Sequence, residues 1–309
     1  MKTYNDLIQR WDMCKGGQLL VDKDHPINNM YLNVNEKGNR ELLIPVLKPI
    51  TKFPSTEAIG LNNYQTPNGC FFVIELLTEN LINEFASLCF DLLQTSRMCS
   101  SKEDAVDRLF DTFRKWYFLM AEVQFDILSV SEIRGLMGEL KYIIDELNAG
   151  KPEHEIVEAW TIHKDASRDF IFDDTWAEIK TIKSTSDYIT ISSLEQLDHN
   201  MNGKLVVYKL DQSDTKTDNM CTLNSMVDEL RNVISVQSKA VLNRKLLAKG
   251  YVYSEEYENY IYEFKKRTVY FVDETFPRLS RSSVNMAIKS AKYDILLNMI
   301  EEWRVMDGE

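Results

Sequence analysis

The chain has 309 residues and a net charge of −12, with 44% apolar and 27% charged residues, which is typical of a soluble globular protein with one large or two ordinary domains. No stretch approaches the roughly 18 apolar residues that a membrane span needs, and an apolar signal core is missing, so we expect a cytoplasmic protein. Five scattered cysteines without C-x-x-C spacing exclude a disulfide framework and a zinc site of the usual kind.

The first region, residues 1–125, is expected to be β-rich and to contain two helices. Segments 29–35 and 40–47 flank the turn-forming run Glu36-Lys-Gly-Asn39, which predicts a β-hairpin. The apolar run 70–77 predicts another strand. The two helices are expected near residues 79–93 and 101–122.

The next helix is predicted from its start signal. Ser129 is followed three residues later by Glu132, which fits a capping box, and apolar residues then recur at helical spacing. Gly135 and Gly138 lie inside this helix and should each cost about 1 kcal/mol relative to alanine, which indicates another backbone close by. Glu139 lies at the edge of the apolar stripe, from where it can point at a neighbouring sheet.

Strands are then expected at residues 158–163, 168–173, 176–182, 187–191 and 204–210. The period of two places Glu178 and Lys180 on the same face of their strand, and Asp169 lies on the strand before it. A second capping box, Ser192 to Glu195, is expected to open a helix. This order predicts an α/β core with a mixed sheet near residues 126–212. A mostly helical extension, residues 213–309, is expected to pack on that core.

The acidic residues of this core suit phosphodiester hydrolysis, which requires a divalent metal, an aligned water and a stabilised leaving oxygen. Asp169 and Glu178 on adjacent strands can hold one or two metals, and Lys180 points into the same site beside the attacking water. The carbonyl of Ile179 is a candidate further ligand, and Glu139 is a candidate outer or second-metal ligand. Residues 121–220 hold 20 acidic but only 10 basic residues, which fits either a metal site or a solvated surface.

The D-x(n)-E-x-K pattern alone is weak, because an acidic chain contains several such matches by chance. For Glu178 and Lys180 the alternative is an exposed ion pair, which contributes about 0–1 kcal/mol. Other chemistries lack their motifs. His154-Glu155 has no second histidine at H-E-x-x-H spacing, and neither a P-loop nor a G-x-S-x-G elbow is present.

Several segments resemble, in order, the PD-(D/E)XK family found in bacterial phage-defence islands: Leu136-Met-Gly-Glu-Leu140, Arg168-Asp-Phe170, Trp176-Ala-Glu-Ile-Lys-Thr181, Ile191-Ser-Ser-Leu-Glu-Gln-Leu-Asp198, Val272-Asp-Glu-Thr-Phe-Pro-Arg-Leu279 and Tyr293-Asp-Ile295. The resemblance covers roughly residues 128–296. It implies a restriction-endonuclease-like core, with helices around a mixed central sheet, and cleavage of DNA with Mg²⁺, for which Mn²⁺ can substitute.

By position, the resemblance assigns Glu139 to the leading acidic motif, Asp169 to the central aspartate, and Glu178 and Lys180 to the E-x-K. Gln196 would lie near the site, where related nucleases often place a glutamine. Arg168 stands where the motif has proline, a departure that changes no metal ligand.

Two functions remain open. The first is a DNA endonuclease of the restriction type that acts against foreign double-stranded DNA, with a homodimer as one arrangement. The second is a non-catalytic or partner-dependent DNA-binding or scaffold subunit of a defence complex. An RNase, or a nuclease for unusual or modified DNA, is a further alternative. Phosphate contacts must come from local basic patches, for which the candidates are Arg231, Lys239, Arg244, Lys245, Lys249, residues 265–267, Arg278 and Arg281.

Overall fold

The computed structural model describes residues 4–14, 17–67, 69–121, 127–162, 168–198, 200–215, 217 and 219–305. The chain divides into two compact units. The first comprises residues 1–126 and 235–253, and the second comprises residues 127–234 and 254–309. This division differs from the three consecutive regions expected from the sequence, because residues 235–253 belong with the N-terminal part. No described helix is long and apolar enough to cross a bilayer.

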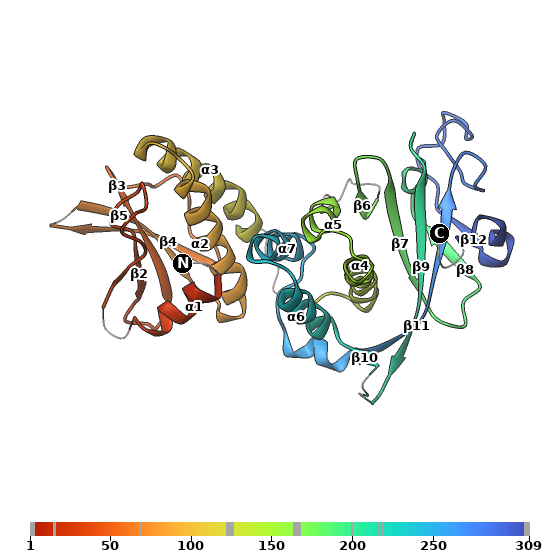
Figure 1. The fold of residues 1–309 in the computed structure, drawn as a ribbon, viewed down its shortest axis with the longest axis horizontal. Coiled ribbons are helices and arrows are strands. Elements are labelled where there is room, and N and C mark those ends of the chain that lie inside the picture. Colours follow the sequence, from red (N-terminus) through yellow and green to blue (C-terminus); the bar gives the residue numbers. More distant parts are fainter. Residues whose placement is uncertain are drawn as a thin grey trace. The chain divides into compact units, whose positions relative to one another are not determined.

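The first unit is a five-stranded antiparallel sheet with helices on one face (Figure 1). Its strands, in spatial order, are β1 (Leu19–Leu20), β2 (Tyr31–Val34), β3 (Arg40–Val46), β5 (Gly69–Leu76) and β4 (Ile59–Thr66). Its helices are α1 (Tyr4–Asp12), α2 (Ile82–Arg97), α3 (Lys102–Ala121) and α7 (Val236–Ala248). The predicted hairpin is confirmed as β2 and β3, and Gly38 in its turn has a φ of 86°, a conformation that favours glycine.

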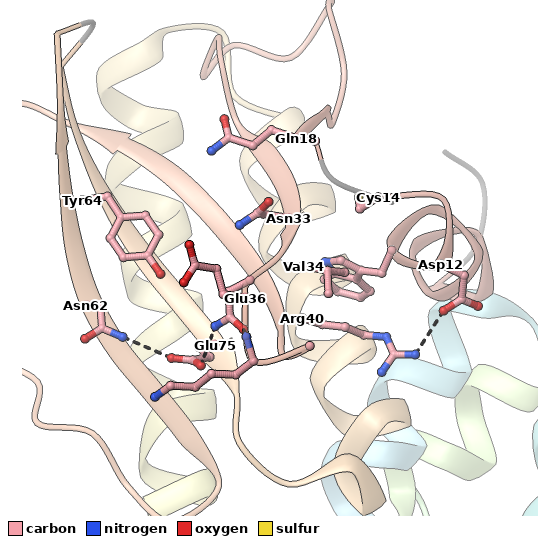
Figure 2. Close-up of a pocket in the computed structure, with 15 residues that line it drawn as sticks. Asp12, Cys14, Gln18, Asn33, Val34, Glu36, Arg40, Asn62, Tyr64 and Glu75 are labelled. Carbon is pink, nitrogen blue, oxygen red and sulfur yellow. Dashed lines mark hydrogen bonds and ion pairs between the residues drawn. The ribbon is translucent and has the colours of Figure 1, made fainter.

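The other face of this sheet carries two buried carboxylates, Glu41 and Glu75. Glu75 lines an open cavity of about 1100 Å³ (Figure 2). Glu41 and Glu75 lie opposite each other on β3 and β5. The Asn35 amide donates to both carboxylates, at 3.0 Å and 2.8 Å, and the Tyr64 hydroxyl donates to Glu41 at 2.6 Å. Burial and this bond to Glu41 raise the pKa of Tyr64. Since Asn35 and Asn39 belong to the hairpin turn, the carboxylates fix that turn against the sheet.

The second unit is built on a mixed five-stranded sheet, as the sequence predicts. Its strands, in spatial order, are β10 (Met220–Cys221), β11 (Ile261–Val272), β9 (Gly203–Ser213), β7 (Trp176–Ile182) and β6 (Phe170–Ile171). Strands β7 and β9 are parallel, and the other pairs are antiparallel. Helices α4 (Val130–Asn148), α5 (Glu153–Ala159) and α6 (Leu223–Val233) belong to this unit, and β8 (Tyr188–Ile191) pairs separately with β12 (Tyr293–Leu296).

Two expectations about the second unit are wrong. The strand expected at residues 158–163 is reduced to one bridging residue, Trp160, because residues 158 and 159 end helix α5. Pro152 precedes this helix, and Glu153 and Glu155 lie in its first turn, which is a favourable helix start. His163 lies outside the described residues. The expected helix after Ser192 is a single 3₁₀ turn, Leu194–Gln196, without a side-chain cap.

The C-terminal region is also not mostly helical. Strand β11 is rich in aromatic and β-branched residues and pairs with β9 along almost its whole length. The helical part of this region consists of two helices, α6 and α7, and the second begins at Ser235, whose side chain accepts the Ser238 amide.

Helix α4 begins as predicted. The Ser129 side chain accepts the Glu132 amide, and the Glu132 carboxylate accepts the Ser129 amide at 2.8 Å. The surroundings of its two glycines differ from the expectation that another backbone lies close to them. A methyl group on Gly138 would collide with the Thr181 side chain and lie 3.4 Å from Ile179, whereas Gly135 has nothing within 4 Å. The close neighbour of Gly138 is therefore a side chain of β7, not a backbone.

Gly138→Ala is expected to lower the free energy of unfolding by about 1–3 kcal/mol, because the collision with Thr181 outweighs the better helix propensity of alanine. Gly135→Ala is the matched control and should raise the free energy by up to about 1 kcal/mol. Urea denaturation of both variants tests this. Equal stability changes of the same sign would contradict the close approach of α4 to β7.

Candidate active site

Strand β7 organises the candidate site. Its residue Glu178 faces the same side as Lys180, and the Lys180 ammonium lies 2.8 Å from Glu178 Oε1. Asp169, immediately before β6, accepts the Ile179 amide through Oδ2 at 2.8 Å. This bond ties the aspartate to the backbone of β7, so the two carboxylates predicted from the sequence do lie on adjacent segments.

Glu178 is the unusual group of the site. Its side chain is only 2% exposed, and in the described part of the chain its Oε2 atom has no hydrogen-bond partner. The pKa of Glu178 is raised to about 8, chiefly by burial and also by the negative charges of Asp169 and Glu139, while Lys180 opposes the shift. A buried carboxylate oxygen without a donor is costly unless a cation or a proton satisfies it.

Glu139 comes from helix α4 on the other side. Its Oε2 atom accepts the indole N–H of Trp160 at 2.5 Å, which fixes the half-buried carboxylate. Its charge acts on Glu178, so both acidic groups belong to one electrostatic environment. Trp160 itself forms a bridge to Phe170 of β6, which links α4 to the strand that follows Asp169.

Gln196 completes the arrangement from the 3₁₀ turn. Its Oε1 atom accepts from the Lys180 ammonium at 3.1 Å and from the Ser192 amide at 2.7 Å. The ammonium of Lys180 therefore lies between two oxygen acceptors. Lys180 contacts Glu178 and Gln196 directly, Asp169 is hydrogen-bonded to the backbone amide of Ile179, and Asp169 and Glu139 both act on Glu178 through their charge.

The oxygen donors suit a hard divalent cation such as Mg²⁺. Glu178 Oε2 is the atom that most needs a cation, and Asp169 and Glu139 supply further carboxylates. Within the described ranges, no three acidic, histidine or cysteine side chains are grouped closely enough to hold an ion together. Mg²⁺ usually keeps several waters and takes one or two carboxylates, so this donor set fits the ion.

Arg168 is a supporting residue whose role the sequence did not reveal. It is 6% exposed, stacks on the Trp176 ring at 5.0 Å, and donates to the carbonyl of Glu195 at 2.8 Å. It also donates to the carbonyl of Asp198. Burial lowers the pKa of Arg168, and the negative charge of Glu178 opposes that shift. Arg168 thus holds both sides of the turn that carries Gln196.

The comparisons with known proteins agree with these motifs. A family model described as "Putative PD-(D/E)XK family member (DUF4420)" matches residues 9–298. The chain belongs to this family. No curated protein and no solved structure matches the chain. The PD-(D/E)XK match also covers the first unit, where the sequence alone showed little resemblance.

In this PD-(D/E)XK chain, Arg168 takes the position of the motif's proline, and its replacement should loosen the turn that carries Gln196. Arg168→Met is expected to lower the free energy of unfolding by about 1–3 kcal/mol, because the carbonyls of Glu195 and Asp198 lose a charged donor that is itself buried. Displacement of Gln196 should also slow catalysis on the order of tenfold or more. Arg304→Met, which removes a partly exposed pair with Glu301, is the control for both measurements.

Most basic residues that the sequence suggested for DNA contacts are engaged within the chain. Arg267 pairs with Glu146 at 2.8 Å, Lys265 with Glu263 at 2.5 Å, and Arg281 with Glu195 at 2.9 Å. Arg231 and Lys245 are buried. Arg244 is the informative exception, because it lines a cavity in the first unit.

Proposed function

We propose that this chain is a metal-dependent endonuclease that hydrolyses phosphodiester bonds of DNA, with Mg²⁺ as its cofactor and Mn²⁺ as a substitute. The observation that carries the proposal is the Glu178 carboxylate, which is buried, has no hydrogen-bond partner for one oxygen among the described residues, and is paired with Lys180 through the other. An ordinary exposed ion pair would show none of this burial. Membership of the PD-(D/E)XK family supports a nuclease over other metal-dependent chemistries.

The metal would be held by Asp169 and Glu178, with Glu139 and the Ile179 carbonyl as further candidate ligands. When bound, it supplies a Lewis acid for the nonbridging phosphate oxygen and lowers the pKa of a bound water. Asp169 also accepts a hydrogen bond from the backbone amide of Ile179, which holds its carboxylate beside β7.

Lys180 is best suited to stabilise the negative charge that develops on the reacting phosphate. Its ammonium is held between Glu178 Oε1 and Gln196 Oε1 by two hydrogen bonds. A fixed positive charge beside the metal ligands can orient the attacking water and stabilise the negative charge that develops on the phosphate. This role needs no proton transfer from the lysine.

The biological role we propose is defence against foreign double-stranded DNA, as in restriction. Cutting both strands needs two reactions, which a homodimer or two successive nicks by one site can supply. The proposal rests on the family match and on the chemistry of the site, and DNA is the substrate class that the family favours.

A partner-dependent, non-catalytic subunit is the second candidate. Two observations favour it: the absence of a ready group of three ligands in the described residues, and the net charge of −12. Such a chain would bind DNA or a defence complex and would cleave only with its partners present, or not at all.

The test is incubation of the purified chain with supercoiled plasmid DNA in Mg²⁺, in Mn²⁺ and in EDTA. Conversion to nicked or linear plasmid in Mg²⁺ or Mn²⁺, but not in EDTA, supports the endonuclease. Parallel reactions with single-stranded DNA, RNA and methylated DNA define the substrate. If the chain cleaves none of these substrates with either metal, the result contradicts the endonuclease and favours the partner-dependent, non-catalytic subunit.

A further inference from the structure

A second cavity, of about 340 Å³, lies in the first unit between α2, α3 and α7. It is lined by Asp91, Thr95 and Met98 of the α2 segment, Arg108, Thr112, Lys115 and Trp116 of α3, and Arg244 of α7. Helices α2 and α3 follow each other in the sequence, whereas α7 comes more than 100 residues later.

Helical spacing explains why the lining residues of α3 converge. Arg108, Thr112 and Lys115 are separated by four and three positions, so they share one face of the helix. The Thr95 and Thr112 hydroxyls lie 3.1 Å apart, and the Trp116 indole N–H donates to the Asp91 carboxylate at 2.9 Å. These contacts fix the two helices against each other and hold the floor of the cavity.

The charges around the cavity are unbalanced. Within the described ranges, none of Arg108, Lys115 and Arg244 forms an ion pair or a side-chain hydrogen bond. By contrast, Arg114 on the same helix pairs with Asp111 at 3.1 Å. Asp91 is the single acidic residue of the lining, and Trp116 already engages it.

Three positive charges face one carboxylate, Asp91, so the lining carries a surplus of two positive charges, and an anion bound in the cavity would reduce their repulsion. The surplus is notable in a chain with a net charge of −12, because its general electrostatic field repels anions. Arginine and lysine with nearby hydroxyl groups are the usual ligands of phosphate oxygens.

We propose that Arg108, Lys115 and Arg244 form a binding site for a phosphate group of a nucleic-acid backbone. The cavity admits a phosphate with its adjoining sugar, not a duplex, so it anchors the backbone from outside. This site is formed by residues of the first unit, whereas the residues of the proposed cleavage centre belong to the second unit. It rests on the proposed function only for the choice of DNA as probe, and it holds whether or not the chain cleaves.

The test uses the full chain in EDTA, so that cleavage does not interfere. Fluorescence anisotropy with a labelled duplex is measured over a series of salt concentrations for the wild type and for a pocket variant, Arg108→Gln with Lys115→Gln and Arg244→Gln. The matched control removes the same charge from exposed positions of the same unit: Lys48→Gln with Lys102→Gln and Arg114→Gln. Thermal melts establish that both variants fold.

The pocket variant is expected to bind at least about tenfold more weakly, and the slope of log affinity against log salt should fall by about one to two, since each phosphate contact contributes about 0.9. The control should stay close to the wild type. Equal affinities of the pocket variant and the control would overturn the proposal, as would an equal loss in both, which would indicate only the net charge.

Competition with inorganic phosphate distinguishes a site for the phosphate of a nucleic acid from a site for free phosphate. If the site serves a nucleic acid, millimolar-range phosphate should compete weakly, and the pocket variant should lose duplex affinity. If inorganic phosphate instead raises the melting temperature of the wild type but not of the pocket variant, and duplex affinity is the same in both, the nucleic-acid assignment is wrong. Failure of the cleavage assay leaves these binding results unaffected.

Discussion

Lys180→Met should reduce plasmid cleavage in Mg²⁺ by about two to three orders of magnitude, the usual loss when one preorganised charge is removed from a developing anion. Methionine keeps most of the length of the side chain and removes only the ammonium. The change also leaves Glu178 Oε1 without its 2.8 Å partner. Because Lys180 lowers the pKa of Glu178, its loss should raise that pKa and weaken metal binding near neutral pH.

The pH dependence distinguishes this mechanism from general damage. Activity of the Lys180→Met variant should recover in part as the pH rises, because Glu178 is then deprotonated and available to the metal. Lys183→Met is the matched control, since Lys183 is exposed just beyond the end of β7 and should be dispensable. Full activity of Lys180→Met, or an equal loss in the control, would remove Lys180 from the mechanism.

Glu178→Gln should abolish cleavage and, in metal-free buffer, make the fold more stable at high pH. The folded pKa of about 8 lies above the ordinary value of 4.5, so the folded protein holds a proton that the unfolded chain releases. The stability of the wild type therefore falls as the pH rises from about 4.5 to about 8, and stays reduced above that. Glutamine is neutral throughout, so the variant avoids a loss on the order of a few kcal/mol.

Thermal melts at several pH values, with and without Mg²⁺, measure this difference. At pH 5 the two proteins should melt alike, and at pH 9 without metal the variant should melt higher. Mg²⁺ should raise the melting temperature of the wild type at pH 9 and leave the variant unchanged, because the ion stabilises the ionised carboxylate. Glu255→Gln, an exposed control in the same unit, should follow the wild type. Identical pH profiles for Glu178→Gln and the wild type would show that Glu178 is not a buried acid with a raised pKa.

The parts of the site that depend on local pattern were predictable. Alternation along β7 was enough to place Glu178 and Lys180 on one face, and Ser129 with Glu132 marked the start of α4. Contacts between distant segments were not predictable. The hydrogen bond from Trp160 to Glu139 depends on packing, and no periodicity encodes it.

The fold shows the same division between local and long-range information. The hairpin of β2 and β3 follows from a turn of four residues, and the structure contains it. Strand β11 was not predicted from the sequence, because Lys265, Lys266 and Arg267 interrupt its apolar pattern. Its partner β9 also lies more than 40 residues earlier in the chain. The break between α6 and α7 likewise depends on one serine cap.

The position of α7 has a consequence for synthesis on the ribosome. Its Asn243 donates to Ser87 of α2 at 2.7 Å in a buried contact, and its Leu247 belongs to the hydrophobic core of the first unit. The first unit is therefore incomplete until residue 253 has left the exit tunnel, by which time the strands from β6 to β10 have already been made. A fragment that ends near residue 126 would expose the apolar surface that α7 covers, so a nascent chain of that length is a natural client for chaperones.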